Sequence, residues 1–388
     1  MKTKNLIALG LISALLAGCS ARQIVKAANP NLDPLPEEST ISVKTGPDPM
    51  ALDQWNMDKV GMKSLWAQPQ TGSRRVVVAL LGTGVDYTHE DLAANILVNR
   101  SEYKKVTTGM QNAVDGKDDD GDGYVDNFIG FDFVENDGLP FDRNGVGTAM
   151  AGIIGAVANN GTGIRGIAPE VSLLPVRFID GSGSFFLPQM IQSLEFALAK
   201  KVDVIVLHTP SYTFGGQATM FDDPTEVTKL EKDGFMQVMT KLQKAGIPVV
   251  ASAGNSGGQL DGQNSLLTAL KQFDNVVVVT SVDKVDKRPY IANFSMRNVH
   301  TTAPGATVLT TQPGGRYADV SGTAVAAAHV GGAMALAISQ FYGKHSTPTL
   351  LRAFLDPKAS DVVQGLQFET MGGNRLNVDK FLTYVSKL

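Results

Sequence analysis

The 388-residue chain contains a single cysteine, Cys19, so it cannot form a disulfide bond within itself. It also has little excess of either charge: 34 Lys and Arg against 38 Asp and Glu give a formal net charge of −4. Without a basic surplus, there is no electrostatic reason to expect nucleic acid as a partner. Hydrophobic residues make up 43% of the chain, which is enough for one sizeable core or two small ones.

The N-terminus has the pattern of an export signal. Lys2 and Lys4 precede an apolar run over residues 6–16, and small residues follow it. The segment Leu16-Ala17-Gly18-Cys19 resembles a bacterial lipobox, which implies a lipoprotein signal peptide over residues 1–18 and a lipid on Cys19. Such a lipid would hold the protein at a membrane of the cell envelope. Ser20 favours the outer membrane; the alternative is an ordinary signal peptide with an incidental cysteine.

Beyond the signal, the sequence predicts a tether and one domain. Residues 19–47 are rich in Pro, Asn, Glu and Ser and predict an extended linker, whereas residues 48–388 carry alternating strand-like and helical patterns. This alternation predicts an α/β fold with a doubly wound, mostly parallel sheet flanked by helices. The predicted strands are Val76–Leu81, Val171–Phe178, Val202–Leu207, Ile247–Ser252 and Val276–Thr280; the predicted helices are Gln189–Lys200, about Glu226–Ala245 and Thr323–Phe341.

An ordered set of short motifs runs through the domain. The three most informative are VALLGTGVD at residues 78–86, NGVGTAMAG at 144–152 and SGTAVA at 321–326. DYTHEDL at 86–92, GIAP at 166–169, SAGN at 252–255 and APG at 303–305 lie between or beside them in the same order. Together they resemble the subtilisin-like serine proteases over about residues 48–388, although each motif alone is weak.

The resemblance implies that the catalytic aspartate, histidine and serine positions are occupied by Gly82, Val146 and Ala324. Acyl transfer by this route needs a hydroxyl nucleophile, an imidazole that takes its proton and a carboxylate that orients the imidazole. Glycine, valine and alanine side chains supply none of these groups. Since loss of the serine alone costs on the order of 10⁶ in turnover in this family, the sequence predicts an inactive pseudoprotease.

Two further positions of the expected cleft carry polar side chains. Asn255 matches the asparagine that completes the oxyanion hole in relatives, but the favoured interpretation is that it holds a turn. The stretch from Val204 to Pro210 matches a strand that ends in Ser-Leu-Gly in active relatives and reads His208-Thr209-Pro210 here. Proline has no N–H to donate to an added peptide strand, so the altered cleft strand predicts weaker peptide pairing. His208 should border the old cleft, most often as a structural residue.

The acidic stretch DDDGDGYVD at residues 118–126 is a separate signal. It resembles the first three quarters of an EF-hand loop, in which alternate carboxylates and a backbone carbonyl bind calcium. The closing glutamate is absent, because Ile129 stands there. We therefore expect a weak structural calcium site with ligands Asp118, Asp120, Asp122, Tyr124 and Asp126. The alternative is a solvated acidic turn.

These expectations combine into an envelope-anchored pseudoprotease that acts as a binding, scaffold or regulatory domain. The resemblance makes an active protease of the same family an attractive protein partner, although no feature of the sequence identifies one. Two alternatives remain open at this level: a hydrolase that uses a non-standard or relocated site, and a structural envelope protein whose lipid and tether carry the function.

Overall fold

The computed structural model describes residues 45–66, 72–102, 116–209, 224–260 and 265–388. The predicted signal peptide, Cys19, nearly all of the predicted tether and Pro210 therefore lie outside the described residues. Gly46 falls inside the predicted tether, yet its N–H already donates to the carbonyl of Asn159 in the domain, at 3.1 Å. Gly46 thus already contacts the domain.

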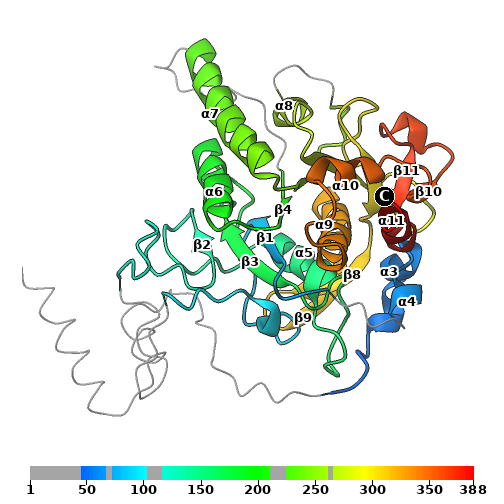
Figure 1. Ribbon diagram of the computed structural model, residues 1–388, viewed down its shortest axis with the longest axis horizontal. Coiled ribbons are helices and arrows are strands. Elements are labelled where there is room, and N and C mark those ends of the chain that lie inside the picture. Colours follow the sequence, from blue (N-terminus) through cyan, green and yellow to red (C-terminus); the bar gives the residue numbers. More distant parts are fainter. Residues whose placement is uncertain (1–44, 67–71, 103–115, 210–223, 261–264) are drawn as a thin grey trace, which may run out of the picture.

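A nine-stranded, mostly parallel sheet forms the centre of the molecule (Figure 1), with strand order β10-β11-β7-β6-β5-β4-β1-β3-β2. Only β10 runs antiparallel to its neighbour. A separate hairpin pairs β8 with β9. The strands are β1 Val77–Gly82, β2 Phe131–Asp132, β3 Ser172–Arg177, β4 Val204–Leu207, β5 Val249–Ser252, β6 Val276–Val282, β7 Thr301–Pro304, β8 Val308–Gln312, β9 Arg316–Val320, β10 Ser360–Val362 and β11 Asn374–Leu376.

Helices cover both faces of this sheet, so the predicted doubly wound α/β fold is confirmed. The helices are α3 Trp55–Lys59, α4 Met62–Leu65, α5 Val146–Gly155, α6 Leu187–Ala199, α7 Pro224–Ala245, α8 Leu266–Leu270, α9 Thr323–Gln340, α10 Thr347–Ala353 and α11 Val378–Val385. Every strand and helix predicted from periodicity is present within a few residues of its predicted bounds. The helix α5 was not predicted, because its small and apolar residues lack a polar face.

The sheet separates two hydrophobic cores. Successive side chains of a strand point to opposite faces, and in β1 Val78 and Leu80 enter the core that contains α5 and α9. Ala79 and Leu81 enter the core that contains α6 and α7. Because both faces are buried, the strands are apolar at consecutive positions, which is typical of a parallel sheet.

The helix α9 is the central helix of the first core. It is long and apolar enough to cross a membrane by length and composition, but it is mostly buried inside the protein. A Cβ at Gly331 would lie 2.4 Å from Cγ2 of Val206, so α9 approaches β4 too closely for any larger residue. A helix that is hydrophobic on all sides is here the core of the domain.

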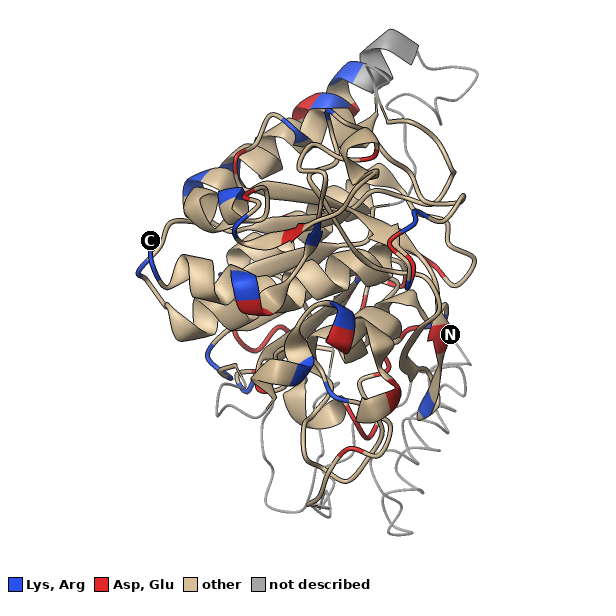
Figure 2. Cartoon of the chain, turned by 90° about the vertical axis from the view of Figure 1, so that its right-hand side faces the viewer, with Lys and Arg blue, Asp and Glu red and all other residues tan. Residues whose placement is uncertain are grey.

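Charged residues lie mainly on the outer helices and loops (Figure 2). Both signs are interspersed in this view, as the small net charge of −4 leads one to expect. The view gives no basic face for a nucleic acid backbone.

Candidate functional site

Four segments that carry the predicted site positions meet at the carboxyl edge of the sheet. Gly82 ends β1, His208 follows β4, Asn255 follows β5 and Val146 begins α5. The strand order reverses between β1 and β4, and in open α/β sheets ligands bind at such a switch point, outside the carboxyl ends of the strands. The fold therefore places the predicted positions where this class of fold builds its sites.

Hydrogen bonds fix both helix N-termini to this edge. The N–H of Gly147 donates to Oγ1 of Thr83 at 2.8 Å, which holds the start of α5 beside the end of β1. The N–H of Gly254 donates to Oγ1 of Thr323 at 2.9 Å, which holds the start of α9 beside the end of β5. Ala324, the next residue of α9, is buried there.

The hydroxyl groups next to the three triad-like positions are engaged in backbone contacts. Oγ1 of Thr83 and of Thr323 each accept one of the N–H bonds just described. Oγ of Ser321 accepts from the N–H of Thr307 at 2.8 Å. Gly82, Val146 and Ala324 supply no titratable group between them. Nothing in this set of described residues pairs a hydroxyl with an imidazole.

Asn255 has a structural role that differs from the expected turn. Its Oδ1 accepts from the backbone N–H of Thr323 at 3.0 Å, so the side chain caps the first turn of α9 from another segment. Its Nδ2 would lie 3.1 Å from a Cβ at Gly322, which leaves this glycine little space for a side chain. Asn255 itself is exposed. The amide therefore joins β5 to α9 at the mouth of the site.

His208 lies at the carboxyl edge of the sheet, directly after β4 and beside the end of β1. Its backbone N–H donates to the carbonyl of Leu81 at 2.9 Å, and its side chain is partly buried. The ring nitrogen Nδ1 is enclosed and has no hydrogen-bond partner among the described residues. Burial lowers the pKa of His208 to about 4, so the ring is neutral at pH 7. The next residue, Thr209, is buried and donates its N–H to Oγ of Ser252 at 2.8 Å.

The other buried histidines have structural partners. In His329, Nδ1 donates to the carbonyl of Val325 and Nε2 accepts from Asn56, both at 2.9 Å. In His89, Nδ1 accepts from the N–H of Asp91 at 3.1 Å, which leaves Nε2 to donate to a backbone carbonyl. These contacts give both residues a role in packing.

A buried ion pair beside Gly82 was missed by the sequence reasoning. Arg177 ends β3 directly opposite Gly82 in register. Its guanidinium contacts Oδ2 of Asp132 at 2.5 Å and Oε1 of Glu135 at 3.2 Å. Arg177 and Asp132 are both almost completely buried. No sequence spacing links the three residues, so only the fold reveals the pair.

The subtilase family model matches residues 73–374, and the chain therefore belongs to the subtilase family. The match includes Gly82, Val146, Asn255 and Ala324.

Several proteases are similar in sequence. Thermitase from Thermoactinomyces vulgaris is 29% identical over 74% of this chain and 82% of thermitase. A thermophilic serine proteinase from Bacillus sp. (strain AK1) is 32% identical over 69% of this chain and 53% of its own length. Subtilisin-like protease 1 from Plasmodium berghei is 28% identical over 74% of this chain and 46% of its own length. The chain thus spans about half the length of the latter two relatives.

A solved structure confirms the fold. The crystal structure of a lanthipeptide protease superposes with a TM-score of 0.65 and covers 88% of this chain and 99% of its own. At 22% identity, this likeness concerns the fold alone.

The acidic loop gathers only part of the predicted ligand set. Oxygens of Asp118 and Asp120 lie within 4.8 Å of one another and of a Glu102 oxygen. Asp122 instead contacts Nζ of Lys200 and accepts from Nδ2 of Asn127 at 2.9 Å. Asp122 therefore does not belong to this group of three carboxylates, although Nζ of Lys200 also lies 3.9 Å from Oδ2 of Asp120.

The remaining two predicted ligands differ in what their contacts imply. The ring of Tyr124 packs edge-on against Phe196, with centroids 4.7 Å apart, which does not involve the backbone carbonyl predicted as its ligand. The carboxylate of Asp126 accepts from the N–H of Gly116 at 3.0 Å. Glu102 was missed because it lies 16 residues before the motif and belongs to no recognisable pattern. Burial raises the pKa of its carboxyl group.

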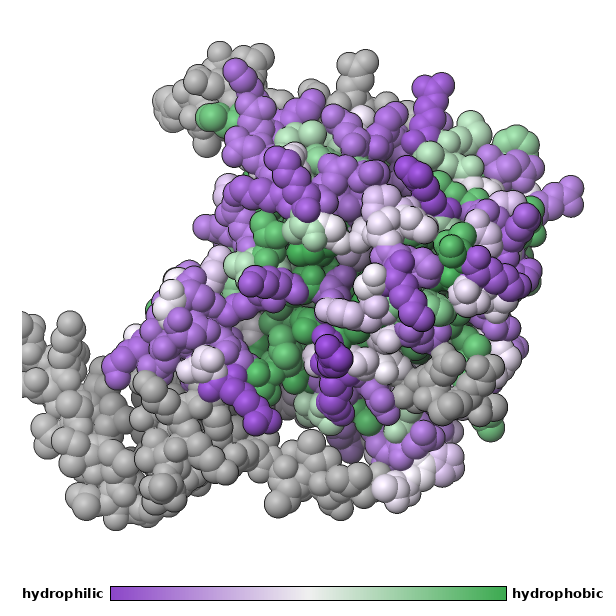
Figure 3. Space-filling model, viewed as in Figure 1, coloured by the Kyte–Doolittle hydropathy of each residue, from purple (hydrophilic) through white to green (hydrophobic). Residues whose placement is uncertain are grey.

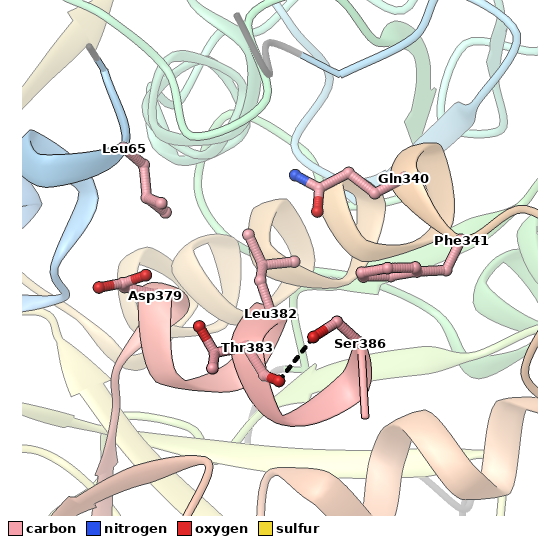
Figure 4. Close-up of a pocket in the computed structure, with 7 residues that line it drawn as sticks. All are labelled: Leu65, Gln340, Phe341, Asp379, Leu382, Thr383 and Ser386. Carbon is pink, nitrogen blue, oxygen red and sulfur yellow. Dashed lines mark hydrogen bonds between the residues drawn. The ribbon is translucent and has the colours of Figure 1, made fainter. Parts of the chain in front are cut away.

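Two hollows lie away from the cleft. One, of about 690 Å³, lies between the C-terminal ends of α6, α7 and α9 and includes Leu198, Ile338 and Phe341; hydrophobic side chains gather between α6 and α9 in Figure 3. The other, of about 520 Å³, lies between α9 and α11 (Figure 4), where Oγ of Ser386 donates to the carbonyl of Thr383 at 2.8 Å. Neither includes a position of the subtilase motifs, so the cleft remains the candidate site.

Proposed function

We propose that this subtilase-family protein is a catalytically inactive pseudoprotease that acts through binding. The observation that carries the proposal is the replacement of all three triad positions by Gly82, Val146 and Ala324. A single replacement would leave part of a catalytic unit, whereas three leave no nucleophile, no base and no orienting acid. The hydrogen bonds of Thr83 and Thr323 support the proposal. Oγ1 of each residue accepts from a backbone N–H, so each hydroxyl next to a triad-like position already has a structural role.

The direct test is reaction of the purified chain with a fluorophosphonate probe, followed by hydrolysis of fluorogenic peptides. We expect no covalent adduct and flat progress curves at high protein concentration. Thermitase, treated in parallel, is the active control. Turnover that co-purifies with the chain and disappears in His208→Ala would contradict the proposal and support a hydrolase with a relocated site.

We propose that Cys19 anchors the protein to the cell envelope, with the outer membrane as its destination. The lipobox and the sole thiol support this assignment. Metabolic labelling with an alkyne fatty acid should modify the full chain and leave Cys19→Ala unmodified. Export of an unmodified wild-type chain would contradict the anchor, without bearing on the state of the triad.

The proposed binding partner is a protein, with an active protease of the same family as the first expectation. Crosslinking in intact cells, followed by purification through a C-terminal tag, should enrich one dominant protein. A chain without the first twenty residues separates the alternatives: if it still captures the partner, the folded domain binds it. If capture is lost while the domain stays folded, the anchor and tether carry the function.

The acidic loop is proposed to bind calcium through Glu102, Asp118 and Asp120. Calcium is held by oxygen ligands at about 2.3–2.6 Å, so oxygens within 4.8 Å of one another can share one ion. Backbone N–H groups of Gly121 and Gly123 donate to Asp118 at 2.8 Å and hold its carboxylate in place. The cation would neutralise carboxylates that otherwise repel one another. Its role here is structural.

A further inference from the structure

The side chain of His208 lies directly beside the backbone of Gly82. Leu81 and Leu207 pair in register, so the residues that follow them are neighbours across β1 and β4 (Figure 1). A Cβ at Gly82 would lie 3.1 Å from Cβ of His208 and 3.7 Å from its Nδ1. The tight contact is between the two β-carbons, and Nδ1 of the ring lies at ordinary van der Waals distance beside the place from which a side chain at position 82 would extend.

Folding does not require this imidazole. Its Nδ1 is enclosed without a hydrogen-bond partner among the described residues, which is costly because the nitrogen gives up water and gains nothing. The backbone after β4 is held by other groups: Oγ of Ser252 accepts from the N–H of Thr209 and donates to its carbonyl, at 2.8 and 3.4 Å.

We propose that His208 blocks the degenerate cleft, so that returning the three triad side chains does not return hydrolysis while His208 remains. The inference rests on the proposed function and deepens it. A carboxylate introduced at position 82 would extend from a Cβ that lies 3.7 Å from Nδ1 of this imidazole. With its proton on Nδ1, the ring would donate to that carboxylate, in competition with an imidazole introduced at position 146. A triad histidine without its carboxylate partner adopts the wrong tautomer and orientation, which costs on the order of 10⁴ in acylation.

The test compares two variants. The first combines Gly82→Asp, Val146→His and Ala324→Ser; the second adds His208→Ser, the residue that the matching Ser-Leu-Gly segment of active relatives implies. In the reaction, the introduced serine hydroxyl attacks the probe phosphorus, fluoride leaves, and the proton passes to the introduced imidazole. We expect mass spectrometry to find the adduct at position 324 in the second variant. Its labelling should be roughly 10²–10⁴ times faster than in the first.

A matched control removes a different histidine. Adding His345→Ser to the first variant deletes an imidazole from the 690 Å³ hollow near α10, away from the cleft, and should not restore labelling. Equal labelling of the first and second variants overturns the inference, as does a folded second variant that is not labelled. Labelling of the unaltered chain would instead overturn the proposed function, so the two failures are distinguishable.

A second measurement covers the case in which the combined variants do not fold. Gly82→Asp alone introduces one carboxylate beside Nδ1 of His208, and the ring proton resonances of that histidine can be titrated by NMR. We expect its apparent pKa to rise by at least one unit, which is a tenfold change in proton affinity, because an opposite charge favours the imidazolium. An unchanged titration curve overturns the inference.

Discussion

His329 and His208 differ in how many hydrogen-bond partners the protein gives to their ring nitrogens. Both rings are neutral, since burial lowers the pKa of each to about 4. In α9, both nitrogens of His329 have partners, whereas Nδ1 of His208 has none among the described residues. His329 therefore contributes hydrogen bonds to the core, whereas Nδ1 of His208 contributes none among the described residues.

The largest expected effect comes from removing the satisfied histidine. His329→Ala leaves a cavity in the first core and leaves Asn56 without its partner, so we expect a loss of about 2–5 kcal/mol in the free energy of unfolding. His208→Ala should change it by no more than about 1 kcal/mol, because no hydrogen bond of its Nδ1 is lost. Urea denaturation of both variants measures the contrast. Equal losses would show that the two environments are energetically alike.

The second prediction concerns how the free energy of unfolding depends on pH through these histidines. A histidine with a folded-state pKa near 4 and an unfolded value near 6.5 binds its proton more readily when unfolded, so stability falls as the pH falls through this window. Each such histidine contributes up to about 1.4 kcal/mol per pH unit.

Comparing the wild-type chain with His208→Ser isolates one such group. Asp91, whose pKa is raised to about 7 by burial, contributes with the opposite sign, but it is present in both chains and cancels in the difference. The variant should therefore lose less stability than the wild type between pH 6.5 and 4. Parallel pH profiles would contradict a depressed pKa at His208.

The third prediction concerns the acidic loop. With an affinity on the order of 10⁻⁴–10⁻³ M, 10 mM calcium should add about 1.4–2.7 kcal/mol of stability by mass action. The melting temperature should rise by a few degrees, and Glu102→Gln should abolish most of that rise. Glu195→Gln, which removes an exposed carboxylate paired with Lys241, is the matched control. A calcium shift that survives Glu102→Gln would place the ion elsewhere.

The smallest expected effect is that of Ala324→Ser alone. One hydroxyl added at the start of α9 should change stability by no more than about 1 kcal/mol. Fluorophosphonate should not label it, because no base stands at position 146. Labelling of this single variant would show that a group other than a residue at position 146 activates the hydroxyl. It would contradict the view that the polar groups near position 324 serve only structural roles.

The sequence was informative where a property is local and repeated. Runs such as Val276–Thr280 predicted buried strands because both faces of a parallel sheet are apolar. Ordered motifs located Gly82, Val146 and Ala324, because their glycines and neighbouring small residues mark tight turns and helix starts. Helix α5 was missed since its residues are buried on nearly every side, which removes the polar face that reveals a helix.

The sequence by itself determined the fold class, the family motifs and the residues at the triad-like positions, since these depend on residue identity and on short spacings. Only the tertiary structure decided which side chains share a space: Arg177 with Asp132, Glu102 with Asp118, and His208 with Gly82. These pairs are brought together by crossovers of the sheet and by long loops. The distances between these residues along the sequence do not predict such contacts, because strand register and side-chain packing are fixed only when the whole domain folds.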